Sequence, residues 1–226
     1  MSKLFRAILI FAVSHSSLAR AQTTQENQLW VASALTAPIA SKSDKAGLGV
    51  WLDLHLRRGS DRTVGIVRPA LGYRFSSAWS LWGGYAWIPT LVDNASDFSE
   101  HRLWQQAIFQ THAKPFRFQV RPRFEQRFHT GQGDVGFRAR LFVRANLRFI
   151  EDLPLDLALW NEVFFGFNDT AWGQLAGFDQ NRVFMGPAWT VGAVRFEVGY
   201  LNVLANRGNG ACAIQHNAAA WAVLSF

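Results

Sequence analysis

The residues most able to do chemistry are arginines at alternate positions of the segment 116–128, which reads FRFQVRPRFEQRF. A guanidinium group presents a planar fork of donors that binds carboxylates and other oxyanions. This spacing therefore predicts either ion pairs with acids of the same protein or the binding of anions. The charged positions along this edge of the segment are Arg117, Arg121, Arg123, Glu125 and Arg127.

Neighbouring segments repeat this alternation of charged and apolar residues. Side chains at alternate positions of a strand lie on one face, so we expect the charged residues of several strands to form one cluster. Arginines outnumber acids in it, which predicts a positive electrostatic field. The residues expected in this cluster are Asp53, Glu100, Arg102, Arg117, Arg121, Arg123, Glu125, Arg127, Arg138, Arg140, Arg144, Arg148 and Glu162.

Two interpretations of this cluster remain open from the residues alone. In the structural one, arginine–carboxylate pairs fill a narrow barrel, and Trp51, Trp104, Trp160 and Phe142 on the same faces help to plug it. In the functional one, the excess of arginine makes the interior a narrow conduit or pocket that attracts small anions.

An enzyme that modifies membrane lipids is the alternative of a different class. Such an enzyme would need a Ser–His pair and a third residue that orients the histidine. Histidines occur at five positions after residue 50, but no serine stands at a matching position on an adjacent strand. No H-E-x-x-H motif occurs, and Cys212 is the single cysteine. We therefore predict no catalytic residue, no cofactor and no metal site.

Period-two alternation runs through most of the chain and predicts an all-β fold. Residues 46–226 give ten strands, and 24–34 would form an eleventh. An odd number would put the N-terminus outside, so we expect ten strands, or twelve if 35–45 holds a further crossing. The ten expected strands are 46–57, 63–75, 78–88, 100–113, 116–129, 136–149, 155–168, 178–191, 194–204 and 212–226.

The N-terminal residues 1–21 have the pattern of a secretory signal peptide. Lys3 and Arg6 precede an apolar run, and Ala19-Arg20-Ala21 is typical of a cleavage site. The apolar run is too short for a transmembrane helix. We expect export and a single domain over residues 22–226.

These features together favour an antiparallel, up-and-down transmembrane β-barrel of ten to twelve strands in the outer membrane of a Gram-negative bacterium. Short and longer connections alternate from residue 63 onward, and many aromatic residues lie near strand ends. The expected partners are outer-membrane lipids, small anions and the barrel-assembly machinery, which would recognise a last strand ending in Phe226. Nucleic acid is not expected, although the net charge is +7, because the arginines lie within strands. A soluble periplasmic barrel that binds an anionic ligand is the remaining alternative.

The chain also resembles a bacterial family known as a domain of unknown function and generally taken to be outer-membrane β-barrels. The resemblance spans most of residues 28–226. It rests on the stretches RPALGYRFSSAWSLWGGYAW, EHRLWQQ, RPRFEQRF and RARLFVRANLRF. It implies a fold and a location, and it brings no catalytic residues.

Overall fold

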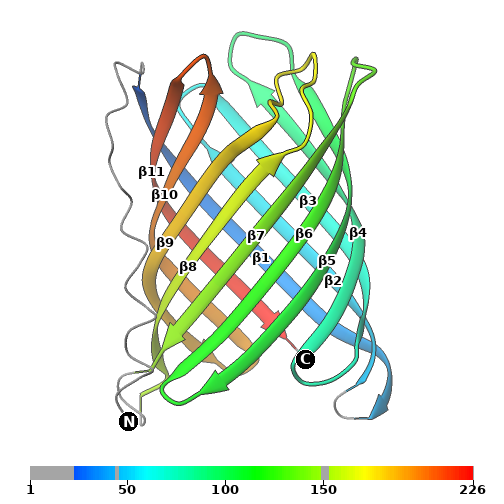
Figure 1. Ribbon diagram of the computed structural model, residues 1–226. Coiled ribbons are helices and arrows are strands. Elements are labelled where there is room, and N and C mark those ends of the chain that lie inside the picture. The colour runs from blue at the N-terminus through cyan, green and yellow to red at the C-terminus, as the bar shows by residue number, and fades with distance from the viewer. Residues whose placement is uncertain (1–22, 44–45, 149–152, 226) are drawn as a thin grey trace.

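The computed structural model describes residues 23–43, 46–148 and 153–225 and shows a closed β-barrel (Figure 1). The expected signal peptide and the terminal Phe226 lie outside the described residues. No described segment is a helix long and apolar enough to cross a membrane.

In the described part of the chain, eleven strands form the wall of the barrel. They are β1 (Thr23–Ser43), β2 (Ala46–Arg58), β3 (Arg62–Arg74), β4 (Trp79–Val92), β5 (Phe98–Ala113), β6 (Phe116–His129), β7 (Val135–Leu147), β8 (Leu155–Gly166), β9 (Gly177–Val191), β10 (Val194–Gly208) and β11 (Ala211–Ser225). The number lies within the expected range of ten to twelve.

The barrel closes through a parallel pair, and this makes the odd number of strands possible. Strand β1 runs beside β11 from Thr23 opposite Cys212 to Thr36 opposite Ser225, and it pairs antiparallel with β2 on its other side. The expectation of an even number was therefore wrong. It rested on keeping the N-terminus away from the outside, whereas β1 runs parallel to β11, extends over 21 residues and continues through the segment 35–43.

The two ends of the barrel are built differently. We call the end that holds 59–61, 93–97, 130–134, 167–176 and 209–210 the loop end, and the opposite end the turn end. The connection between β10 and β11 is shorter than the expected 205–211. Strand β10 continues to Gly208, and Asn209 and Gly210 turn the chain with φ values of 51° and 75°, as in a tight hairpin. Thr23 begins β1 at the loop end, while β11 finishes at the turn end.

Alternation along each strand separates an apolar outer face from a charged inner face. In β7, Phe137 and Leu141 are 40% and 47% exposed on the outside, whereas Arg138 and Arg140 are buried. In β6, Phe124 and Phe128 are exposed and Arg123 and Glu125 are buried. Burial of the charged positions and exposure of the apolar ones is the reverse of the usual pattern of a water-soluble domain.

The interior of the barrel is filled by side chains. One buried cluster brings together Trp30, Phe142, Trp160, Phe184 and Leu201, with Trp221 against it. A second contains Ile66, Trp82, Ala86, Trp104 and Ile108, with Trp51 against it. These inward aromatic residues form the apolar core, and the charged groups lie around them.

Candidate functional site: an arginine-rich interior and vestibule

Glu125 is the most highly connected carboxylate of the interior. Its side chain is 1% exposed and lies within 4 Å of four arginines, with Arg138 Nη2 at 2.6 Å and Arg140 Nη1 at 2.5 Å. Arg102 and Arg123 are more distant, at 3.6 and 3.7 Å. A carboxylate offers about four lone-pair sites, so Glu125 can bind several guanidinium groups.

The partners of Glu125 differ partly from what β6 alone suggests. Glu125 lies between Arg123 and Arg127 in the sequence, but Arg127 binds Glu100 instead, at 2.5 Å. Residues two apart on a strand are separated by about 6.6 Å, whereas residues opposite each other on neighbouring strands are closer. Arg138 lies directly opposite Glu125 in β7, which explains the preference.

Further pairs extend this group to other strands. Glu162 binds Arg140 at 2.6 Å and lies 3.6 Å from Arg182. Asp53 lies 3.1 Å from Arg68. We call the whole set the loop-side ionic cluster. Its members are Asp53, Arg68, Glu100, Arg102, Arg123, Glu125, Arg127, Arg138, Arg140, Glu162, Asp179 and Arg182.

A second group of ion pairs lies near the turn end. Asp156 accepts hydrogen bonds from Arg195 at 2.7 Å, Arg148 at 2.8 Å and Arg117 at 3.3 Å. Glu197 binds Arg195 and Arg144, both at 2.9 Å. The turn-side ionic cluster thus consists of Arg117, Arg144, Arg148, Asp156, Arg195 and Glu197. The single cluster expected from the sequence is divided between the two ends.

Arg121 lies between the two ionic clusters. Its guanidinium carbon is 3.8 Å from the centroid of the Phe142 ring and 5.9 Å from that of Trp51. Among the described residues it has no carboxylate within 4 Å, and its Nε has no hydrogen-bond partner. Trp160 packs against Phe142 and Phe184, and its ring centroid lies 5.4 Å and 5.3 Å from theirs. These aromatic rings and Arg121 fill the middle of the barrel.

Several interior residues were absent from the expected cluster. They are Arg57, Arg68, Asp156, Asp179, Arg182, Arg195 and Glu197. Period-two alternation contained the signal for Arg57, Arg68 and Asp156, which stand on the polar faces of their segments. Asp179 could not be placed in this way because a register shift near Phe164 and Phe165 interrupts the pairing of β8 with β9.

A cavity of about 380 Å³ occupies the interior at the loop end, and we call it the vestibule. The described residues that line it include nine arginines and three carboxylates, those of Glu26, Glu100 and Asp179. The lining arginines are Arg57, Arg62, Arg68, Arg102, Arg127, Arg138, Arg140, Arg182 and Arg207. Asp53, Glu125 and Glu162 pair with some of these arginines but are not part of the lining. The surface of the vestibule therefore presents positive charge.

The loop 167–176 folds over part of the vestibule. Trp172 stacks on His129 with ring centroids 5.8 Å apart, and the Arg127 guanidinium lies 4.8 Å from the Trp172 ring. Arg127 also donates a hydrogen bond to Gln174 at 2.9 Å. A side chain on Gly136 would meet Trp172 and Gln174, so the absence of one there leaves room for the loop.

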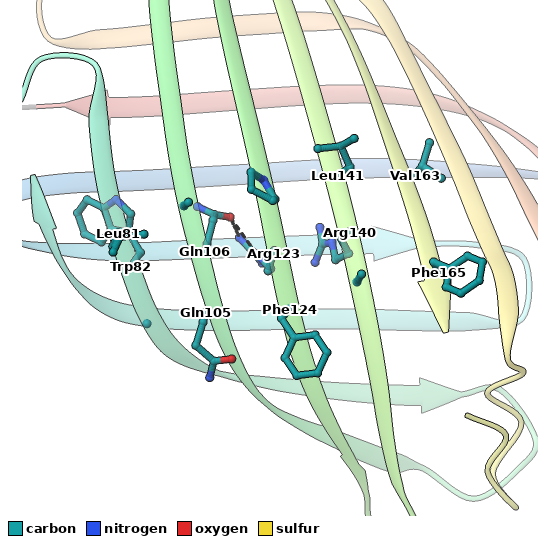
Figure 2. Close-up of a pocket in the computed structure, with 14 residues that line it drawn as sticks. Leu81, Trp82, Gln105, Gln106, Arg123, Phe124, Arg140, Leu141, Val163 and Phe165 are labelled. Carbon is teal, nitrogen blue, oxygen red and sulfur yellow. Dashed lines mark hydrogen bonds between the residues drawn. The ribbon is translucent and has the colours of Figure 1, made fainter. Parts of the chain in front are cut away.

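A larger cavity, of about 910 Å³, lies on the outer wall between β4 and β8 (Figure 2). Its outward lining is largely apolar and includes Leu81, Phe124, Leu141 and Phe165, each at least 37% exposed, with Gln105 as a polar member. Figure 2 also shows Arg123 hydrogen-bonded to Gln106 on the inner side of the same wall. The charged chemistry is thus confined to the interior.

Two histidines of the outer face bind tyrosines rather than acids. The Tyr85 hydroxyl lies 2.5 Å from His101 Nδ1, and the Tyr200 hydroxyl lies 2.5 Å from His216 Nδ1. Neither histidine has a carboxylate within 4 Å in the described part of the chain. Nor do any three His, Cys, Asp or Glu side chains among the described residues gather as they would around a metal ion.

The fold and its interior define a closed β-barrel whose lumen is filled by arginines, acids and aromatic rings. Within this class, the chain belongs to the family described as "Protein of unknown function (DUF2490)", whose profile matches residues 27–212. A relative in Methylorubrum extorquens, the uncharacterized protein MexAM1_META1p0181, is 32% identical in an alignment of 219 positions that covers 90% of each chain. Among solved structures, LpxR from Salmonella typhimurium aligns over 79% of this chain and 83% of its own, with 7% identity and a TM-score of 0.41. That likeness is too weak to carry a functional argument.

Proposed function

We propose that this protein is an outer-membrane β-barrel whose lumen is closed to ion flow and whose vestibule attracts and binds small anions. The observation that carries the proposal is the excess of positive charge in the vestibule, whose described lining has nine arginines and three carboxylates.

The outer wall supports a location in a lipid bilayer. Leucines such as Leu48, Leu56, Leu71 and Leu141 are 47–62% exposed on it. An exposed apolar surface of this kind would favour aggregation in water. A closed barrel leaves no unpaired strand edge, which is a requirement in hydrocarbon. In the proposed orientation the turn end faces the periplasm. The assembly machinery would bind the last strand there, and the loop end would face outward.

The aromatic packing supports a closed lumen. Trp160 of β8 contacts Phe142 of β7, Phe184 of β9 and Trp221 of β11, with ring centroids 5.3–5.5 Å apart. Arg121 of β6 extends this layer from Phe142 to Trp51 of β2. An ion moving between the two ionic clusters would have to cross this layer, and a constriction of apolar rings opposes the passage of hydrated ions.

Reconstitution into planar bilayers tests the closed lumen. We expect a conductance close to that of the bare bilayer, with any residual current carried by anions. A large, steady and non-selective conductance would identify an open pore instead.

Unfolding measurements in detergent test the binding of anions. Pyrophosphate should raise the unfolding midpoint at constant ionic strength, because a ligand that binds only the folded state stabilises it. The polycation spermine should not. Equal effects of the two ions would contradict a positive vestibule.

A further inference from the structure

Arg57 differs from the other arginines of the vestibule. Eight of the nine lining arginines lie within 4 Å of a carboxylate. Among the described residues Arg57 has no such partner, and its Nε has no hydrogen-bond partner. Arg57 is half-buried, and a cation withdrawn from water without a counter-charge is costly, so an anionic ligand at Arg57 would supply the missing partner.

The side chain of Arg57 is held in place by Trp30. The two residues are opposite each other in β2 and β1, and the guanidinium carbon of Arg57 lies 3.9 Å from the centroid of the indole ring. The indole Nε1 donates a hydrogen bond to Gln28 at 3.0 Å. This stacking fixes the plane of the guanidinium group while leaving its donors free along the edge.

Positive charge surrounds this position. Arg182 lies 5.0 Å from the same indole ring, and its nearest carboxylate, that of Glu162, is 3.6 Å away. Arg62 and Arg68 also line the cavity. Several cations around a guanidinium that has no carboxylate partner in the described part of the chain favour a doubly charged oxyanion over a singly charged one.

The size and the lining of the vestibule indicate what carries the oxyanion. A volume of about 380 Å³ is within the range of sites for small organic ligands and far exceeds what a bare inorganic ion fills. Polar side chains, including Gln28, Thr90 and Gln180, form part of the wall. They could hydrogen-bond hydroxyl groups of such a ligand.

We propose that Arg57 anchors the phosphate of a small hydroxylated phosphomonoester, of the sugar phosphate kind, in the vestibule. This inference rests on the proposed anion-binding function and names its ligand class and its anchoring residue. A free solute and the phosphorylated headgroup of a neighbouring lipid share this chemistry.

Titration calorimetry on the refolded full-length barrel tests the site, with glucose 6-phosphate as the probe and glucose as its uncharged match. We expect binding of glucose 6-phosphate only. Arg57→Gln should weaken it at least about tenfold, because two charge-assisted hydrogen bonds are lost. Arg57→Lys should recover part of the affinity, since it restores the charge without the planar fork.

Arg58→Gln is the matched control. Arg58 is the next residue of β2, lies outside the vestibule and pairs with Asp93 at the surface, so its loss removes the same charge from the protein. Binding should stay within about twofold of the wild type. Equal losses in the two variants would overturn the site at Arg57, and so would equal binding of glucose and glucose 6-phosphate.

Two further results separate the remaining possibilities. If pyrophosphate raises the unfolding midpoint but glucose 6-phosphate does not bind, the proposed function stands and the ligand class is wrong. Reconstitution into vesicles with and without phosphatidic acid distinguishes the two sources of phosphate. If phosphatidic acid lowers the affinity for glucose 6-phosphate and Arg57→Gln abolishes this competition, the result supports a lipid headgroup at this site. If phosphatidic acid leaves the affinity for glucose 6-phosphate unchanged, the result supports a free solute.

Discussion

Glu125 of β6 and Arg138 of β7 face each other across the strand pair, and Arg138 Nη2 lies 2.6 Å from Glu125 Oε2. This pair joins β6, the strand richest in charged residues, to β7 and is closed off from solvent, since the two side chains are 1% and 4% exposed. The loop-side ionic cluster is organised around it.

Replacement of Glu125 by Gln should destabilise the barrel strongly. Four arginines would lose their shared counter-charge, and the loss of one partner from a buried ion pair costs about 3–5 kcal/mol. The free energy of unfolding in detergent measures the effect. Asp93→Asn is the control, because Asp93 pairs with Arg58 at an exposed position, where the cost should be below about 1 kcal/mol. Similar costs for both variants would contradict the importance of the buried cluster.

An arginine at the middle of the outer wall should impair insertion. Leu141 is 47% exposed at the centre of β7, and Leu141→Arg should cost about 2–4 kcal/mol if lipid surrounds this position. Leu153→Arg, in the connection at the turn end, should cost little. Folding into lipid vesicles at increasing urea concentration gives both values. Full tolerance of Leu141→Arg would mean that this face meets water.

Removal of one ring from the middle of the barrel should open a path for ions. Trp160→Ala deletes a ring that contacts Phe142, Phe184 and Trp221, and the neighbouring Arg121 and Arg144 should make the new conductance selective for anions. Trp189→Ala removes an indole from the outward face of β9 and should change nothing. The single-channel current in planar bilayers compares them. A Trp160→Ala barrel as silent as the wild type would show that other residues close the lumen.

The loop 167–176 should be released by Gly166→Ala. A β-carbon at this position would overlap the carbonyl oxygen of Leu175, so the loop could not keep its place over the vestibule. Limited proteolysis should then cleave within 167–176 faster than in the wild type. Gly133→Ala provides the control, since a β-carbon there meets nothing within 4 Å. Equal cleavage rates would contradict the packing of this loop.

Much of the barrel could be predicted because alternation is a local property of the sequence. The segment FRFQVRPRFEQRF predicted both the bounds of β6 and the burial of Arg123 and Glu125. Two features depended on interactions that no local pattern records. Residues 35–43 alternate poorly and include Pro38, so the length of β1 and its parallel pairing with β11 could not be seen. Trp172 belongs to a loop without periodicity, and its place over the vestibule follows from contacts with β6 and β7.

The identity of the ion pairs was the least predictable part of the interior. Strand periodicity assigns a face but gives no information about which neighbour is opposite, because a shift of register moves every partner. Arg127 follows Glu125 on the inward face of β6, yet it binds Glu100 on β5. Arg57 stood on a polar face in the sequence, yet its lack of a carboxylate partner among the described residues became visible only in the folded barrel.

Fractionation of the producing cells, with gel migration measured before and after boiling, tests most directly whether this barrel belongs to the outer membrane. We predict recovery of the folded protein in the outer-membrane fraction, with a band that shifts on boiling as the closed barrel unfolds. Recovery as a soluble periplasmic protein, without such a shift, would contradict the proposed location and with it the outward orientation of the vestibule.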